Sequence, residues 1–151
     1  MNELMRQGCP VPEVYGELTI NHELVLPDQK PPMEVLLSYK VDFEITKLEV
    51  IETKLTVEKE QQVVPLRKVI VDGTAKIVVK YAADVPDQQV HGAHFDVPFS
   101  TLIEWPDGPP GGSAVCAEIV PEHVQIDQID DRRLRKVIVI QVNICQQTCE
   151  T

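Results

Sequence analysis

The chain has 151 residues, of which 43% are apolar, and its 24 acidic side chains outnumber 14 basic ones to give a formal net charge of −10. This length supports one sizeable hydrophobic core and is short for two domains. The negative charge disfavours binding to nucleic acid or to an anionic membrane, because both are polyanions. No apolar run reaches the roughly eighteen residues that cross a bilayer, and the N-terminal sequence lacks a basic region followed by an apolar one. We therefore expect a protein made in the cytosol without a signal peptide.

Alternation of apolar and polar side chains predicts β-strands along most of the chain. A first strand is expected within residues 14–26, where the even positions are mainly apolar. His22 falls on this apolar parity and is expected to be a hydrogen-bonded core histidine. The prolines within residues 27–32 end the strand, and residues 33–37 are expected to form a helical turn or a bend.

A long ribbon follows over residues 39–57, and its alternation changes register partway. Tyr39 and Phe43 lie on one parity, whereas the later part of the ribbon also places apolar residues such as Leu48 and Val50 on the other. Such a slip predicts a bulge or a hairpin turn within residues 46–53. Pro65 is expected to separate this ribbon from the next pair of strands.

Residues 67–100 carry the clearest pattern, and we expect the fold to be organised around them. Ile77 and Tyr81 belong to the apolar parity of the first half, and Phe95 and Phe99 to that of the second half. Residues 84–87, between the halves, have the composition of a turn. The segment is therefore predicted to be an antiparallel hairpin.

Two further β regions are expected, over residues 113–127, interrupted by Pro121, and over residues 136–144. Short strands separated by Pro and Gly predict an all-β fold, an antiparallel β-sandwich or flattened barrel. We divide the chain into an extended N-terminal arm (1–13), a single β domain (14–144) and a short cysteine-containing C-terminal tail (145–151). Shared parity gives the expected core residues: Ile20, Leu24, Phe43, Ile77, Val79, Tyr81, Phe95, Phe99, Ile119, Ile138, Ile140 and Val142.

Four short motifs lie within this pattern. They are E-x-x-L-P-x-x-K-P from Glu23, K-V-I-V-x-G from Lys68, Y-x-A-D from Tyr81 and V-H-x-x-x-F-x-V-P-F-S from Val90. Together they resemble the SPOCS domain, a spore-coat and peptidoglycan-associated module of endospore-forming Firmicutes, over residues 14–144. The resemblance implies a role in spore coat assembly through protein contacts and not catalysis. It also implies synthesis in the mother cell and exposure to the outside when that cell lyses.

Residues suited to catalysis or metal binding form no recognisable motif. His91 and His94 are the nearest pair, but residues three apart in a strand point to opposite faces, so both rings reach one ion only across a bulge. The sequence has no Gly-x-Ser-x-Gly elbow and no phosphate-binding glycine loop. Asp127, Asp130 and Asp131 cluster at an expected turn, where Asp bonds the backbone. We expect no enzymatic activity, no cofactor and no metal site.

The cysteines, at positions 9, 116, 145 and 149, give a more informative pattern. In the last expected strand the apolar residues occupy even positions, so Cys145 lies on the opposite face, and Cys149 would share that face if the strand continued. Cys116 likewise alternates with its apolar neighbours. Structural cysteines are usually buried with the apolar set, so these three are expected to face outward. Cys9 lies on the arm.

Three arrangements of these cysteines compete. A bond between Cys145 and Cys149 along one extended strand is disfavoured, because their Cα atoms would be about 13 Å apart and a disulfide needs less than about 7 Å. A four-thiolate zinc site is disfavoured because no C-x-x-C spacing is present. Interchain disulfides fit best, since they require thiols at ends and surfaces and an oxidising medium. Cys9 is expected to bond to Cys116, Cys145 or Cys149 of another subunit.

The resemblance and the cysteines together predict a structural, self-associating spore-surface protein of the coat, exosporium or an appendage, cross-linked by interchain disulfides. The cysteine-bearing arm and tail resemble, in architecture only, the covalently linked subunits of endospore appendages. The alternative is a monomeric adaptor that docks a spore coat morphogenetic protein through an exposed sheet face or edge. The expected partners are copies of the chain itself and other coat proteins, with neither nucleic acid nor membrane among them.

Overall fold

The computed structural model describes Cys9 and residues 11–146, and within this part of the chain every regular element is a β-strand. The strands are β1 (Val14–Ile20), β2 (Glu23–Val25), β3 (Met33–Lys59), β4 (Gln62–Ala83), β5 (Val90–Glu104), β6 (Cys116–Gln128) and β7 (Arg133–Cys145). The predicted all-β fold is confirmed.

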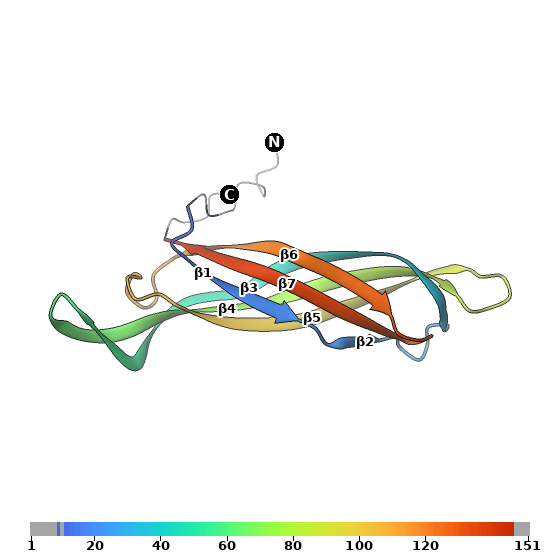
Figure 1. Cartoon of the computed structure of the whole chain (residues 1–151), viewed down its shortest axis with the longest axis horizontal. Helices are drawn as coiled ribbons and strands as arrows, with labels where there is room; N and C mark the ends of the chain where they lie inside the picture. Colours follow the sequence, from blue (N-terminus) through green and yellow to red (C-terminus); the bar gives the residue numbers. More distant parts are fainter. Residues whose placement is uncertain (1–8, 10, 147–151) are drawn as a thin grey trace.

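The strands form two antiparallel sheets that pack as a sandwich and do not close into a barrel (Figure 1). In the first sheet β7 is central, with β6 along one side and β1 and then β2 along the other. The second sheet is the meander β3-β4-β5. Because β3 and β4 are much longer than the strands of the first sheet, their hairpin extends past the end of the sandwich (Figure 1).

The core lies between the two sheets and follows the alternation of the sequence. Of the twelve residues expected there, nine are buried, and Phe43, Phe95 and Ile119 are partly buried against the rest. Tyr81 is the largest fully buried side chain. Its hydroxyl donates to the carbonyl oxygen of Pro31 at 2.8 Å, and burial raises the pKa of Tyr81. The parity argument thus identified the interior of both sheets.

The central hairpin forms as predicted. Strands β4 and β5 pair in one unbroken register from Lys68↔Glu104 to Ala82↔Val90. At its middle Gly73 lies opposite Phe99, and a Cβ at position 73 would collide with the Phe99 ring and lie 2.6 Å from the carbonyl oxygen of Glu44. The glycine of K-V-I-V-x-G is therefore explained by the close approach of a neighbouring strand and an aromatic ring.

The expected change of register in the long ribbon is confirmed. Strand β3 shifts register against β4 between Ile45 and Lys47, and again between Glu52 and Thr56. The chain turns only after Lys59, where Glu60 and Gln61 both have positive φ. The register change is therefore a bulge inside one strand.

Three expectations about strand ends are wrong. Residues 33–37 begin β3 instead of forming a helical turn, because pairing with β4 holds them extended. Pro65 lies inside β4 opposite Thr56, where β5 has not yet begun to pair, so its missing N–H breaks no second ladder. His22 is exposed because it lies in the break between β1 and β2, although Ile20 before it and Leu24 after it, on the same parity, are buried.

Candidate functional site

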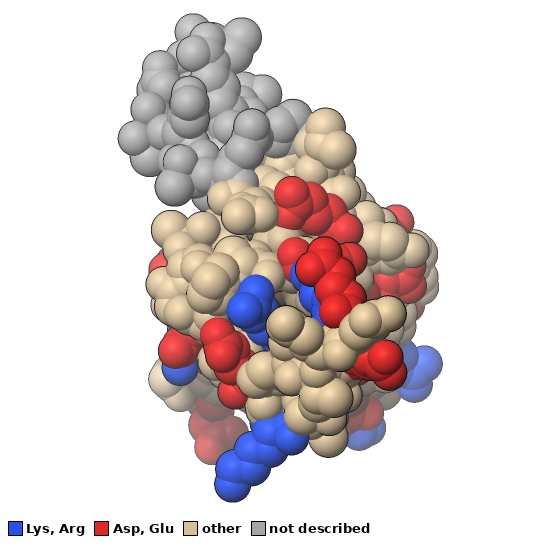
Figure 2. Space-filling model, turned by 90° about the vertical axis from the view of Figure 1, so that its left-hand side faces the viewer, with Lys and Arg blue, Asp and Glu red and all other residues tan. Residues whose placement is uncertain are grey.

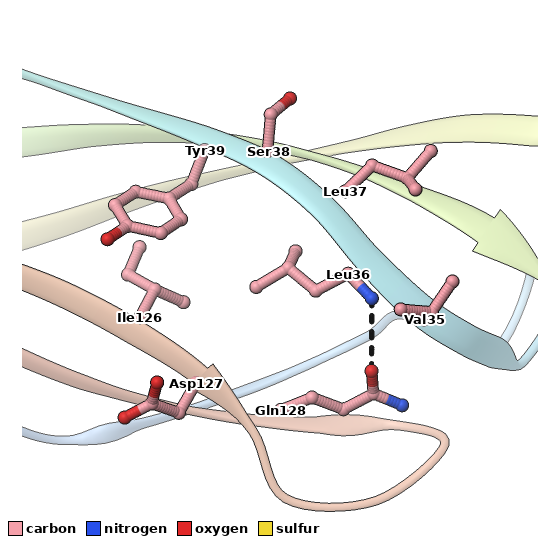
Figure 3. Close-up of a pocket in the computed structure, with 8 residues that line it drawn as sticks. All are labelled: Val35, Leu36, Leu37, Ser38, Tyr39, Ile126, Asp127 and Gln128. Carbon is pink, nitrogen blue, oxygen red and sulfur yellow. Dashed lines mark hydrogen bonds between the residues drawn. The ribbon is translucent and has the colours of Figure 1, made fainter.

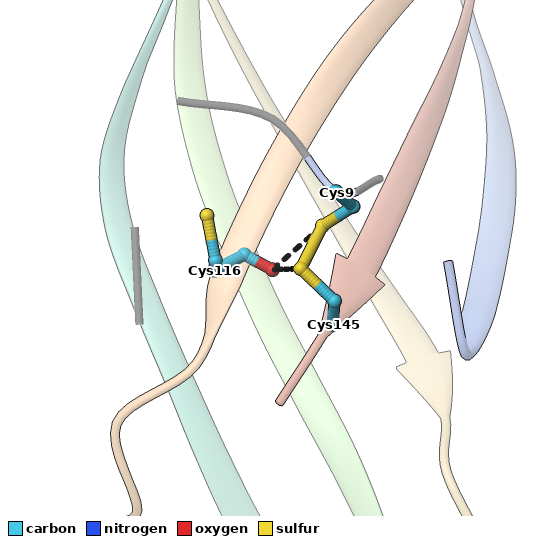
Figure 4. Close-up of side chains that lie close together, drawn as sticks. All are labelled: Cys9, Cys116 and Cys145. Atoms are coloured by element: carbon cyan, nitrogen blue, oxygen red, sulfur yellow. Dashed lines mark hydrogen bonds between the residues drawn. A yellow bond between two sulfur atoms is a disulfide. The ribbon is translucent and has the colours of Figure 1, made fainter. Parts of the chain in front are cut away.

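Three cysteines distant in sequence meet at the end of the sandwich where β1 and β6 begin and β7 ends (Figure 4). Cys116 and Cys145 lie directly opposite each other in the β6–β7 ladder. Cys9 precedes β1, whose first residue, Val14, pairs with Ile144. The sulfur atoms of the three cysteines all lie within 4.8 Å of one another.

Cys9 and Cys145 form a disulfide within the chain. Their Cα atoms are 5.6 Å apart, within the usual range for a bridge, although 136 positions separate the two residues in sequence. The sulfur of Cys9 also lies 3.4 Å from the carbonyl oxygen of Cys116 and 3.6 Å from that of Asn143. Among the described residues no cysteine is a free thiol. The bond therefore ties the segment before β1 to the end of the last strand.

The expectation that Cys116 and Cys145 face solvent is wrong. Their parity is as predicted, on the side of the sheet away from the core, but their exposed fractions are 1% and 4%. Asn143, on the same side, is 6% exposed, and so is Cys9. Cys9 lies against this end of the sheet and is buried together with them, so the outer face is not open to solvent there.

The bond between Cys9 and Cys145 of one chain differs from the pairing expected from the sequence. The partner expected for Cys9 was a cysteine of another subunit, whereas in this single chain it is Cys145 of the same polypeptide. The two cysteines meet because β1 pairs antiparallel with β7, which brings residue 13 beside residue 144. Cys149, the fourth candidate, lies outside the described residues.

A second feature is the groove between β3 and β6, the outer strands of the two sheets on one side of the sandwich (Figure 3). It has a volume of about 580 Å³. The Gln128 amide spans it, since Oε1 accepts a hydrogen bond from the Leu36 backbone N–H at 3.0 Å and Nε2 donates to the Glu34 carbonyl oxygen at 3.2 Å. Val35 and Leu37 beside it are about half exposed. One side chain thus occupies part of an edge to which another strand could pair.

The other residues weighed as functional serve local structure. The His91 ring stacks on that of Tyr81, with centroids 6.0 Å apart. His94 is exposed with Nε2 3.0 Å from Asp96 Oδ1, so the two histidines point apart as predicted. The Asp130 carboxylate accepts the backbone N–H groups of the following turn, and these bonds together with the side chain of Arg133 lower the pKa of Asp130. Within the described ranges, the three cysteines form the only group of His, Cys, Asp or Glu close enough to hold a metal ion.

Acidic and basic side chains form ion pairs at several places among the described residues. On the end of the molecule shown in Figure 2, the basic side chains that the structure describes are separated by acidic and uncharged ones. Many are paired, as in the 2.6 Å contact between Lys76 Nζ and Glu44 Oε2. The part of the chain described here also contains no helix of the length and apolar character needed to span a membrane.

The protein is an all-β sandwich in which a buried disulfide joins the segment before β1 to the end of β7. The family model described as SipL, SPOCS domain matches residues 32–129, which is 98 of the 151 residues. The chain belongs to this SPOCS-domain family, which indicates a spore-associated role. Comparison with curated proteins and with solved structures gave no match.

The matched range is narrower than residues 14–144, over which the motifs resemble the family. It contains β3 to β6 and leaves out β1, β2 and β7. Cys116 therefore lies inside the match, whereas Cys9 and Cys145 lie outside it. The disulfide therefore joins two residues that both lie outside the matched range.

Sequence reasoning missed one buried charged group, Lys136 on β7. It shares the core parity of Leu134 and Ile138 and is 1% exposed. Its Nζ donates to the carbonyl oxygen of His22 at 2.5 Å, and burial lowers the pKa of Lys136. The available signal was the even position of this lysine at the start of an otherwise apolar strand.

Proposed function

We propose that this protein is a structural, self-associating component of the spore surface, a coat or appendage subunit whose copies are cross-linked by disulfides. The observation that carries the proposal is the buried cysteine cluster, in which a bond joins the segment before β1 to the end of β7. Membership of the SPOCS-domain family supports the spore-associated setting. A cross-linked assembly needs cysteines that a rigid sheet holds in place, and Cys145 at the end of β7 meets this requirement.

Exchange of the arm between copies would turn the bond within one chain into a bond between two. If Cys9 of one subunit occupied the same position on a neighbour, it would meet the same Cys145 sulfur and the same carbonyl oxygens of Cys116 and Asn143. Such a swap conserves the contacts and is a low-cost route to assembly. Because the arm and the end of β7 are different surfaces, the contact is head-to-tail, and repeated copies form a ring or a filament.

The test is to oxidise a mixture of two isotopic forms of the chain. Equal amounts of unlabelled and ¹⁵N-labelled protein are reduced, mixed and oxidised together, and the peptides that contain the Cys9–Cys145 bond are identified by mass spectrometry. Bonds between chains give mixed-isotope peptides in about half of the linked population, because swapped partners are chosen at random. Non-reducing electrophoresis then shows a ladder that Cys9→Ser removes.

Two controls make the result decisive. Chains oxidised separately and mixed afterwards report any exchange that occurs during handling. If co-oxidised chains contain only same-isotope Cys9–Cys145 pairs and run as monomers, the cross-linked subunit is excluded.

The second candidate is a monomeric adaptor that docks a spore coat protein. Two observations favour it: the disulfide closes within one chain, and the groove between β3 and β6 exposes Val35 and Leu37 beside a partly open edge. An adaptor of this kind would bind an extended segment of its partner along the edge of β3. Same-isotope disulfides in a monomeric protein support this candidate.

A further inference from the structure

Part of the outer edge of β3 has no partner strand within the described chain. Strand β3 lies at the edge of the second sheet. The loop after β5 covers this edge near Val50, whose carbonyl oxygen accepts a hydrogen bond from the Gly112 N–H at 3.0 Å. Further along, β5 no longer pairs with β4, so residues 53–59 belong to the two-stranded part of the hairpin that extends past the sandwich (Figure 1). An open edge of this kind is a template for another strand.

The charges on the edge strands single out this segment of β3. Strands β1, β2, β5 and β6 carry acidic residues and neither Lys nor Arg, so two copies of any one of these edges would repel each other. Strand β3 also contains four lysines. Three of them form ion pairs with described carboxylates: Lys40 with Asp42, Lys47 with Glu49 and Lys59 with Asp107. The fourth, Lys54, is exposed, as is Glu58, and neither forms an ion pair with a described residue.

We propose that two copies of this chain associate through residues 53–59 of β3, which pair antiparallel about a two-fold axis at Thr56. In this register Lys54 of each copy lies opposite Glu58 of the other, so the contact makes two ion pairs. On the other face of the strand Leu55, which is 58% exposed, lies opposite the partly buried Val57 of the other copy. Both faces of the pairing therefore bring compatible side chains together.

The register of this pairing is specified by the same charges. A shift that moves the two-fold axis between Thr56 and Val57 places Lys54 of one copy opposite Lys59 of the other, which is a pair of like charges. The bulge in β3 also favours a second strand here. Strand β3 pairs with β4 at Glu52 and again at Thr56 but not between them, so the backbone groups of the intervening residues lie outside the ladder to β4.

The expected contact is a weak and reversible one. The paired segment is short, and an interface below about 1,200 Å² is typical of transient association. The net charge of −10 on each copy also opposes close approach. The dimer should therefore dissociate on dilution. This inference goes beyond the disulfide exchange proposed above and does not depend on it, because the contact is non-covalent and leaves the Cys9–Cys145 bond of each copy intact.

The test reverses the two charges one at a time and then mixes the variants. Sedimentation velocity of the full-length oxidised chain is measured over a range of concentrations at fixed pH and ionic strength, where the parent should show a monomer–dimer equilibrium. Lys54→Glu and Glu58→Lys each replace two attractive pairs by two repulsive ones, so each should weaken dimerisation at least about tenfold. An equimolar mixture of the two variants restores opposite charges at both pairs of a mixed dimer and should associate about as tightly as the parent.

Lys80→Glu is the matched control, because it changes the net charge by the same amount at an exposed position on β4. At fixed ionic strength it should alter dimerisation less than about twofold, since exposed charges beyond a Debye length are screened. Circular dichroism verifies that each variant is folded.

A cross-link reports the register independently. Residues opposite each other in an antiparallel pair have Cα atoms about 4.5–5.5 Å apart, which is within the range of a disulfide. Oxidised Thr56→Cys should therefore form a bond between the introduced cysteines of two copies, identified by mass spectrometry. Val63→Cys, at a 73% exposed position on the other strand of the hairpin, should not.

Three results would overturn the pairing. They are a parent that sediments as a monomer up to about 1 mM, single reversals that dimerise like the parent, and a mixture that associates no better than its components. Any of these leaves the disulfide exchange unaffected, because that proposal is decided by mixed-isotope bonds that persist in denaturant.

Discussion

Removal of the Cys9–Cys145 bond should cause a large loss of stability, and its size follows from the length of the loop it closes. The residues are 136 apart in sequence. Cross-linking such a loop removes unfolded-state entropy equivalent to about 5 kcal/mol at 25 °C in the chain-entropy description. For a chain of this size, each kcal/mol shifts the Tm by about 2–4 °C, so the double variant Cys9→Ser/Cys145→Ser should melt about 10–20 °C lower than the oxidised parent. The double variant avoids leaving one buried thiol that could pair elsewhere.

The assay is urea denaturation of the oxidised parent and the double variant at several protein concentrations. A bond within the chain gives a stability independent of concentration, whereas a swapped arm makes the midpoint rise with concentration. With a phosphine reductant present, the two proteins should unfold at similar midpoints, which is the control for the substitutions themselves. A difference below about 1 kcal/mol between the oxidised proteins would refute the loop-closure reasoning.

Three further outcomes are expected. Gly73→Ala should lower the free energy of unfolding by about 1–3 kcal/mol, because the added Cβ meets Phe99 and the neighbouring strand. Gly92→Ala is the control, since a Cβ there has no heavy atom nearer than 3.7 Å, and it should cost less in the same denaturation assay. Burial lowers the pKa of Lys136 in the folded chain below the 10.5 of an exposed lysine. Between these two values the unfolded chain binds more protons than the folded chain, so the free energy of unfolding rises with pH. Lys136→Met should remove this dependence of stability on pH without loss of stability at neutral pH. If the dependence persists in the variant, it arises from other groups. Because the acidic subunits repel one another, self-association measured by light scattering should strengthen with added salt or as the pH falls towards the pI of about 4.8. Light scattering that changes with neither salt nor pH would contradict an acidic interface.

Short-range alternation predicted the sheets well because the face that a side chain occupies is set by its immediate neighbours. The pairing of β4 with β5 and the bulge after Ile45 both follow from sequence spacing alone. The errors at residues 33–37 and at Pro65 have the opposite origin. Local turn and proline preferences indicated breaks there, and pairing with a long neighbouring strand overrode them.

Strand parity alone did not predict whether the cysteines are exposed. It placed Cys145 correctly on the side of β7 away from the core, but a face is exposed only if nothing covers it. Cys9 lies against this face, although almost the whole chain separates it from Cys145 in sequence, and the antiparallel pairing of β1 with β7 brings the two together.

Cys116 and Cys145 are buried on the side of β7 away from the two-sheet core, so the core itself does not supply their cover. Among the described residues, Cys9 lies against them, with its sulfur 3.4 Å from the carbonyl oxygen of Cys116 and 3.6 Å from that of Asn143. If subunits exchange the segment that carries Cys9, as proposed above, the same contacts would be restored on a neighbour. The end of the sandwich is therefore the surface at which the proposed exchange would occur. Because the segment that carries Cys9 and the end of β7 lie at different positions on each subunit, the exchange would favour a closed monomer at low protein concentration and a row of linked subunits at high concentration.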